Sequence, residues 1–149
     1  MNLGRQCPTQ HPVIVTVTVT VTELEPTFMD YFEFERLDVY QVSLDFVAAA
    51  DEITDRLPRG RAYLKDQTRR AANSIPANIA EGVGEFAPKE KVRFYRMARR
   101  SAVECASHLL VCKRLKLFEG PQLTPALELL RRVVAMLTAL VKRTGARAT

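Results

Sequence analysis

The sequence has no tryptophan, two histidines and three cysteines, and these shortages narrow what the protein can be. The cysteines, Cys7, Cys105 and Cys112, are odd in number and lack a framework spacing, so we expect reduced thiols and a reducing compartment. No apolar run reaches the roughly 18 residues that a membrane span needs. The first residues also lack the basic start and apolar stretch of a secretory signal. We therefore expect a cytoplasmic protein with no membrane association.

Metal ligands are scarce as well. Cys105, His108 and Cys112 stand at positions i, i+3 and i+7, so all three can share one face of a helix. Zinc needs a fourth ligand, and the remaining candidates, Cys7 and His11, lie in an unusual N-terminal segment. Because cysteine is among the most buried residue types, we expect Cys105 and Cys112 in the core and no metal site.

Catalytic patterns are missing too. The sequence has no serine nucleophile motif, no pair of carboxylates that stands out as acid and base, and no glycine-rich phosphate loop after a strand. Glu81 beside Gly82 is the one catalytic candidate, and an ion pair with Arg69 or Arg70 is the simpler interpretation. We expect no enzymatic activity and no cofactor.

What the sequence does contain is a strong separation of charge. Residues 30–55 hold eight acidic residues and one basic residue, a net charge of −7. Residues 56–149 hold seven acidic and twenty basic residues, a net charge of +13, and residues 1–29 contribute −1. These three values sum to the formal net charge of +5. The pattern predicts an acidic first helix and a basic remainder.

The N-terminal segment alternates valine and threonine in the run VIVTVTVTVTE, a period-two pattern typical of a strand. No second strand candidate follows it, and an unpaired strand is prone to aggregate. Three interpretations remain open: a disordered tail, a strand that pairs with another molecule, and an upstream start site with the working protein beginning near Met29. We assign residues 1–28 to a disordered or mis-annotated tail and residues 29–149 to one domain.

The remainder shows helical spacing of apolar residues in four runs. The first covers about residues 36–56 with Leu37, Tyr40, Leu44, Val47 and Ala48 on its stripe; the second runs from 62 to about 84 with Leu64, Thr68, Ala71, Ile75 and Ile79. The third starts at Ala87-Pro88 and continues through Leu115 and Leu117, with Val92, Tyr95, Ala98, Ala102, Cys105, Leu109 and Cys112. The fourth carries Leu123, Leu127, Leu130, Val134, Leu137 and Val141, with Thr124-Pro125 as its expected start. Short loops between such helices predict an all-α, antiparallel up-down-up-down four-helix bundle.

Pro76 stands inside the second run, where it removes a backbone donor and crowds the carbonyl of Ala72, at a cost of about 3 kcal/mol in an ordinary helix. Close packing around the neighbouring small residues can offset this cost. Side chains such as Ser74, Asn73 or Asn78 can bond the freed backbone groups. We expect a second helix kinked at Pro76; the alternative is two short helices that meet at residues 74–76.

Three segments resemble the four-helix-bundle family encoded in intervening sequences of bacterial 23S rRNA genes. They are LDVYQ (37–41), LKDQTRRAANSIPANIAEGVGE (64–85) and KEKVRFYRMARRSAVECASHL (89–109), and the resemblance extends over about residues 34–142. The SIPANIAEG motif is quite specific to this family. Accessory proteins of diversity-generating retroelements are related to it and share the bundle.

The resemblance implies a small helical protein that assembles into a ring-like homopentamer. For the retroelement relatives it further implies a basic surface that binds nucleic acid and a reverse transcriptase. The family members themselves have no established biochemical activity, so the resemblance supplies a fold more firmly than a function.

Basic residues recur at helical spacing on the second and third helices. Such rows neutralise the phosphates of a nucleic acid and release counterions without reading sequence. We expect them to bind nucleic acid, RNA in preference to DNA; the alternatives are solvated faces paired to Glu81, Glu85 or Glu104, or a scaffold that docks a partner such as a reverse transcriptase. The residues concerned are Arg61, Lys65, Arg69 and Arg70 on the second helix, and Lys89, Arg93, Arg96 and Arg100 on the third.

The first helix carries the opposite charge. Asp38, Asp45 and Glu52 recur every seven residues and form an acidic ridge. This ridge can meet a basic ridge on a neighbouring subunit and fix orientation in a homo-oligomer; simple solvation is the alternative.

Overall fold

A computed structural model describes residues 32–147 of the chain. Within this range the protein is all-helical, with four long helices, one short 3-10 helix and no strand. The predicted all-α class and the four long helices are confirmed. The tail assigned to residues 1–28, the boundary near Met29 and the residues Cys7 and His11 lie outside the described residues.

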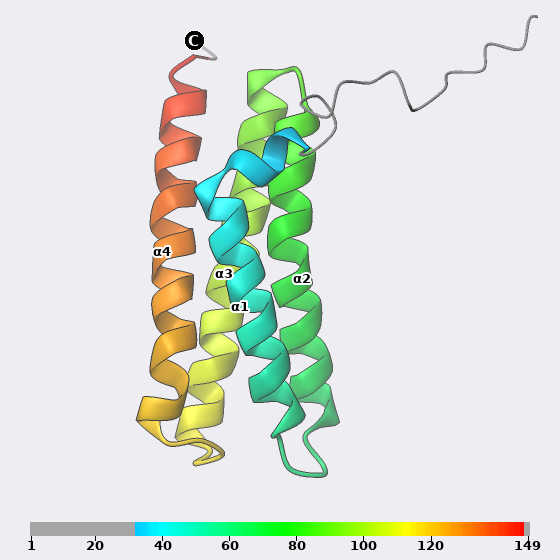
Figure 1. Cartoon of the computed structure of the whole chain (residues 1–149), viewed down its shortest axis with the longest axis vertical. Coiled ribbons are helices and arrows are strands. Elements are labelled where there is room, and N and C mark those ends of the chain that lie inside the picture. Colours follow the sequence, from blue (N-terminus) through cyan, green and yellow to red (C-terminus); the bar gives the residue numbers. More distant parts are fainter. Residues whose placement is uncertain (1–31, 148–149) are drawn as a thin grey trace, which may run out of the picture. The chain divides into compact units, whose positions relative to one another are not determined.

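The helices follow one another with short connections. They are η2 (Glu33–Arg36), α1 (Asp38–Asp55), α2 (Ala62–Gly84), α3 (Pro88–Arg114) and α4 (Gly120–Gly145). The four long helices lie side by side in Figure 1. Helix α1 contacts α2 and α4, and α3 contacts the same two helices on the other side. Each long helix therefore has two neighbours and buries an inner face against them.

Local sequence explains the first two connections. Gly60 adopts a φ of +90° between α1 and α2, a conformation that favours glycine because it has no Cβ. Pro88 occupies the first turn of α3, where its missing N–H would have no intrahelical partner in any case. The breaks expected between the first and second runs and between the second and third runs are therefore present.

Helix α3 ends earlier than predicted. Lys116 takes the left-handed conformation with a φ of 55°, and the N–H of Leu117 donates to the carbonyl of Cys112 at 3.0 Å. The N–H of Lys116 also donates to the carbonyl of Lys113 at 3.0 Å. These two bonds form a Schellman cap that satisfies the last carbonyls of the helix. Leu115 and Leu117 follow the helix because the chain turns here.

Helix α4 begins earlier than predicted, so the start at Thr124-Pro125 is wrong. The helix starts at Gly120, where the N–H of Glu119 donates to the side-chain oxygen of Gln122 at 2.8 Å. This side-chain cap satisfies the donor that precedes the first turn. Pro125 consequently lies inside the helix, and Thr124 donates to the carbonyl of Gly120 at 3.0 Å.

The core is built from the inner stripes of all four helices. The stripes predicted for α2 and α3 are buried in full. The largest fully buried apolar side chains are Phe46, Ile75, Ile79, Leu109, Leu123, Leu130 and Leu137. Each such side chain contributes about 1.5–3 kcal/mol relative to its exposed form.

The stripe predicted for α1 is correct only in part. Its core face is made by Val39, Val42, Phe46, Ala50 and Ile53, whereas Leu44 is 40% exposed and Ala48 is also exposed. Helix α1 has apolar residues on two faces, and spacing alone does not decide between them. Leu37, Tyr40 and Val47 of the predicted stripe are half-buried and pack against this core, so the predicted stripe lies at the margin of the core.

Pro76 is buried within α2, which continues without interruption from Ala62 to Gly84. The alternative of two short helices is therefore wrong, while the kink stays a prediction. Ser74 donates to the carbonyl of Ala71 at 2.9 Å, and the side-chain amide of Asn78 donates to the carbonyl of Ser74 at 2.7 Å. The Ser74 and Ser101 hydroxyls are 2.6 Å apart and link this segment to α3. Side-chain bonds and burial thus surround the proline, as the sequence suggests.

Gly82 lets α2 and α3 approach each other closely near the end of the same segment. A Cβ added at Gly82 would lie 2.6 Å from Cε1 of the Tyr95 ring. Heavy atoms do not come this close without displacement, so only glycine fits beside the ring as it stands. The glycine that ends the SIPANIAEG motif therefore allows the Tyr95 ring to pack directly against α2.

Candidate nucleic-acid interface

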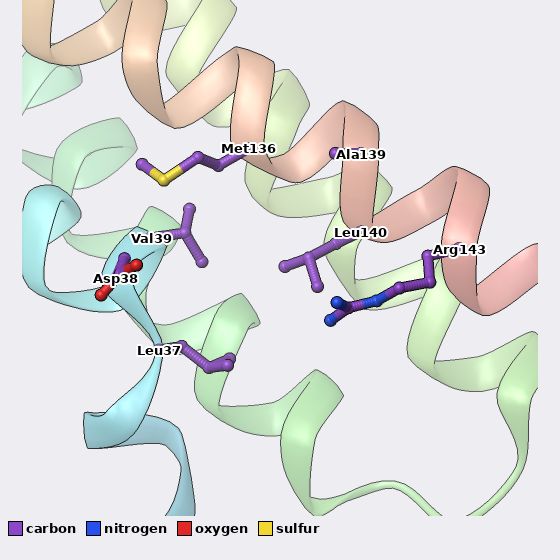
Figure 2. Close-up of a pocket in the computed structure, with 7 residues that line it drawn as sticks. All are labelled: Leu37, Asp38, Val39, Met136, Ala139, Leu140 and Arg143. Carbon is purple, nitrogen blue, oxygen red and sulfur yellow. The ribbon is translucent and has the colours of Figure 1, made fainter.

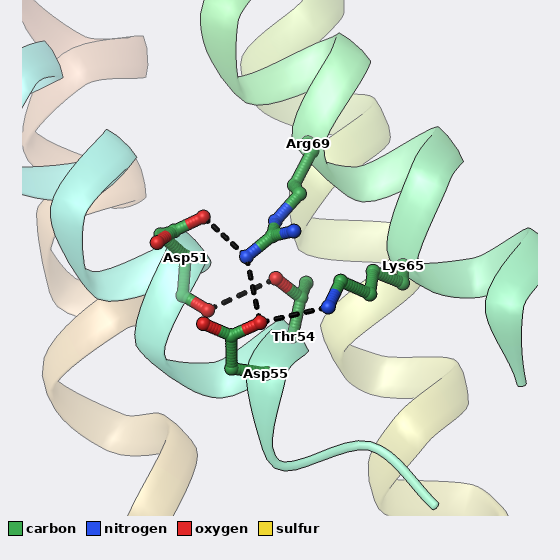
Figure 3. Close-up of polar contacts among 5 residues, drawn as sticks. All are labelled: Asp51, Thr54, Asp55, Lys65 and Arg69. Atoms are coloured by element: carbon green, nitrogen blue, oxygen red, sulfur yellow. Dashed lines mark hydrogen bonds and ion pairs between the residues drawn. The ribbon is translucent and has the colours of Figure 1, made fainter. Parts of the chain in front are cut away.

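The cations of α2 face the acidic end of α1. Figure 3 shows Lys65 and Arg69 reaching toward Asp51 and Asp55. Lys65 Nζ lies 2.7 Å from Asp55 Oδ1, and one guanidinium nitrogen of Arg69 pairs with Asp51 and with Asp55, the latter at 2.9 Å. The Lys65 and Arg69 side chains are only 34% and 31% exposed. These two cations are committed to carboxylates of the same chain.

This cluster has local electrostatic consequences. The hydrogen bond from Lys65 lowers the pKa of Asp55 below its ordinary value of 3.8, against the opposing effect of burial, and the nearby charge of Arg69 acts in the same direction. The Thr54 hydroxyl donates to the carbonyl of Asp51 at 3.1 Å and supports the turn of helix that carries the two carboxylates. Nε of Arg69 is buried without a hydrogen-bond partner. The alternative pairing of Arg69 with Glu81 is wrong, because Arg69 contacts α1.

The other predicted cations of α2 differ from this pair. Arg61 donates a 3.4 Å hydrogen bond to the Tyr63 hydroxyl and is half-buried. Arg70 is exposed, and within residues 32–147 it has no ion pair. The predicted row on α2 is therefore divided between cations that hold α1 and cations that remain at the surface.

The cations of α3 face solvent. Lys89, Arg96 and Arg100 are exposed, and the described part of the chain offers none of them an ion pair. Arg93 is 65% exposed and pairs with Glu90, one turn earlier, at 3.0 Å. Its guanidinium carbon also lies 5.7 Å from the centre of the Phe94 ring. Pairs this exposed are worth about 0–1 kcal/mol, so Arg93 remains available to other anions.

One further arginine belongs with this face. Arg99 is exposed beside Arg100, and its Nε donates to the Thr138 hydroxyl of α4 at 3.1 Å. Its position lies off the four-residue spacing that defines the predicted row. The sequence signal for Arg99 is that it directly precedes Arg100, a member of the predicted row.

Helix α1 has two groups of carboxylates with different surroundings. Asp51 and Asp55 pair with α2, as described above. Asp38, Asp45 and Glu52 are exposed and, across residues 32–147, make no ion pair. The acidic ridge predicted from the sequence is therefore at the surface, and its role in subunit contacts stays a prediction.

Cys105 and Cys112 are free thiols in the core, as predicted, with at most 2% of their surface exposed. Burial first, and then the charge of Glu104, raises the pKa of Cys105 to about 12, so its thiol stays protonated. His108 lies 3.3 Å from the Thr68 hydroxyl through Nδ1. Among the described residues no group of three potential metal ligands comes together.

A shallow groove of about 260 Å³ lies between the start of α1 and the last turns of α4. Figure 2 shows Leu37 and Val39 facing Met136 and Leu140 across it, with Asp38 and Arg143 at its edges. The groove is mainly apolar and has one charge of each sign. It suits a packed side chain better than a polar ligand.

The fold and its surface define a class: a small protein of four packed helices with free thiols inside and a solvent-facing cationic helix. No helix among residues 32–147 is long and apolar enough to cross a membrane. The family model for the 23S rRNA-intervening sequence protein matches residues 35–139. The chain belongs to this family, as its motifs indicated. No individually curated protein matches the sequence.

Proposed function

We propose that the protein is a non-enzymatic, cytoplasmic homo-oligomer that binds nucleic acid, RNA in preference to DNA, through its cationic helix faces. The observation that carries the proposal is the row on α3, where Lys89, Arg96 and Arg100 are exposed without ion pairs among the described residues. Rows of unpaired cations attract a polyanion and release its counterions. Arg61 and Arg70 extend this surface onto α2, whereas Lys65 and Arg69 mainly join α2 to α1.

The proposed architecture is an antiparallel up-down-up-down four-helix bundle with α2 kinked at Pro76. Its support is the cyclic set of contacts, in which each helix meets its two neighbours, and the short connections between consecutive helices. A kink is the usual response of a helix to an internal proline.

The homo-oligomer has support on α1. Leu44 is 40% exposed and Ala48 is exposed on a second apolar stripe, next to a groove of about 320 Å³ that Ala72 and Asn73 also line. The free acidic ridge of Asp38, Asp45 and Glu52 is complementary in sign to the row on α3. A copy that docks through these features would bury apolar area and orient itself by charge. A pentamer is proposed from the resemblance to the family alone.

The decisive experiment reverses the charge of the row. The triple variant Arg93→Glu, Arg96→Glu, Arg100→Glu should lose at least about a hundredfold in RNA affinity at matched salt, because each lost phosphate contact weakens binding several-fold. The measurement is fluorescence anisotropy with a structured RNA, and helicity and oligomer size should be unchanged. The matched control carries Arg59→Glu, Arg114→Glu and Arg132→Glu, three exposed cations outside the predicted rows. If the two triple variants bind alike, the α3 site is wrong.

A second function has its own observation. Val103, Leu110 and Val111 are 50%, 52% and 41% exposed in the second half of α3, beside the cations of the first half. Large apolar side chains at the surface are typical of a protein contact. The alternative is therefore a scaffold that docks a partner such as a reverse transcriptase. A steep fall of RNA affinity with rising salt favours the first function, while partner binding with no measurable RNA affinity favours the second.

A further inference from the structure

Another pocket, which has a polar lining, lies where η2 and the ends of three long helices meet. Its volume is about 310 Å³, near the lower end of the range of about 300–1,000 Å³ typical of ligand sites. Side chains from η2, α2, α3 and α4 line it. The polar ones are Glu33, Lys91, Tyr95, Arg143, Thr144 and Arg147.

Tyr95 is the buried element of this pocket. The residue is only 5% exposed. Its ring lies directly against Gly82 of α2, where there is no side chain to displace it. Tyr95 is one of the lining residues, and its hydroxyl makes no hydrogen bond to any of residues 32–147. Buried tyrosine hydroxyls usually have a hydrogen-bond partner. The Tyr95 hydroxyl is not one of the enclosed, unpaired polar atoms of residues 32–147, so it is accessible from the pocket and can donate to a molecule bound there.

The charges of the lining are unbalanced. Lys91, Arg143 and Arg147 supply three positive charges, and Glu33 supplies one negative charge, which leaves +2. None of these four forms an ion pair with any described residue. Lys91 donates to the carbonyl of Val83 at 2.9 Å, which holds its ammonium group at the pocket. Like charges gathered around one cavity raise the local potential, and an anion placed between them relieves their repulsion.

We infer that this pocket binds a phosphate group, with Lys91, Arg143 and Arg147 as its cations and the hydroxyls of Tyr95 and Thr144 as neutral donors. A tetrahedral dianion offers enough oxygens for donors that converge from several helices, which a single carboxylate does not. Arg143 lines the apolar groove as well as this pocket, and Figure 2 shows it extending from α4 beside Leu140.

The source of the phosphate is either the end of a nucleic-acid strand or a free phosphate compound. The strand-end source rests on the proposed function. Lys89, the first cation of the α3 row, and Lys91 both lie in the first turn of α3, so a strand along the row would end at the same end of the helix as the pocket and would pass around the helix to reach it. A strand end carries a phosphate with more charge than the internal diesters and would occupy the pocket in preference to them.

The first test uses the full chain and inorganic phosphate as probe, with affinity measured by calorimetry. Tyr95→Phe keeps the ring beside Gly82 and should weaken phosphate binding about tenfold, the effect of one hydrogen bond to a charged group. Arg143→Gln should weaken it by at least as much. Glu33→Gln should strengthen it about threefold, because a repulsive charge is removed. Arg132→Gln, an exposed cation of α4 outside the pocket, is the matched control and should bind as the parent.

The outcomes separate cleanly. Absence of phosphate binding by the parent, or equal weakening by Arg143→Gln and Arg132→Gln, would overturn the inference.

In the second test, RNAs that carry a 5′-phosphate, a 3′-phosphate or only hydroxyl ends are compared. A preference for one phosphorylated end that Tyr95→Phe abolishes identifies the strand end as the source, and equal binding of all three identifies a free phosphate compound. The proposed function is tested separately, with an RNA that lacks terminal phosphates. If the α3 triple variant binds this RNA as its matched control does, the proposed function is wrong.

Discussion

Helices α2 and α3 carry similar rows of cations, yet the rows have different surroundings. On α2, Lys65 and Arg69 are about a third exposed and hold two carboxylates of α1. On α3, Arg96 and Arg100 are exposed and have no carboxylate partner in the described part of the chain. The difference shows that cation spacing predicts a face but not its use. The neighbouring helix decides whether that face stabilises the fold or remains free for a ligand.

The largest effect should come from the tightly packed end of α2. Gly82→Ala places a methyl group 2.6 Å from the Tyr95 ring, so we expect a loss of about 1–3 kcal/mol in the free energy of unfolding. Urea denaturation measures it. Gly84→Ala is the matched control, because a Cβ there meets no atom within 4 Å, and it should cost nothing. Equal stability of the two variants would show that α2 is less tightly packed against α3 than the geometry indicates.

The next effect concerns the two rows directly. Arg96→Gln with Arg100→Gln should weaken RNA binding about tenfold and reduce the slope of log affinity against log salt by about 1.5–2, the loss of two phosphate contacts. Lys65→Gln with Arg69→Gln removes the same formal charge and should change the slope by less than about half as much. Salt titrations of RNA affinity measure both. Equal slopes for the two double variants would remove the distinction between the rows.

The smallest effect is the reverse comparison on stability. Arg69→Gln should lower the free energy of unfolding by up to about 1 kcal/mol, since it removes two partly exposed ion pairs, while Arg96→Gln should leave it within about 0.5 kcal/mol. A larger loss for Arg96→Gln would contradict the assignment of Arg96 to a free surface.

The same ion pairs predict a dependence on pH. The folded chain lowers the pKa of Asp55 below 3.8, so it binds this proton less tightly than the unfolded chain. The contribution of Asp55 is therefore fully present above pH 3.8 and is lost as the pH falls through the lowered value. Asp55→Asn should be less stable than the parent at about pH 7, and the difference should vanish toward about pH 2. A difference that persists at the lowest pH would mean that Asp55 does not act through its charge.

The inner faces of α2 and α3 were predictable from sequence because their polar and apolar positions separate cleanly. The face of α1 was not, since apolar residues such as Leu44 and Phe46 lie on both of its sides. The start of α4 was missed because the pattern at Thr124-Pro125 resembles a helix start more strongly than the cap at Glu119 does.

The candidate site was also predictable from the sequence only in part. The exposure of Arg96 and Arg100 follows from a position opposite the apolar stripe of one helix, which spacing reveals. The partners of Lys65 and Arg69 depend on how two helices align along their length, and spacing within one helix contains no such information. The pocket at Tyr95 requires the ends of several elements to meet. Only the assembled chain brings Lys91 of α3 near Arg147, which follows the end of α4.

The proline in α2 also has a consequence for the order in which the chain folds. An isolated helix with an internal proline is unstable in water, and Ser74 reaches its partner Ser101 only once α3 exists. During synthesis from the N-terminus, residues 74–84 leave the ribosome before any part of α3. We therefore expect the second half of α2 to become stably helical only after α3 has been synthesised and packs against it.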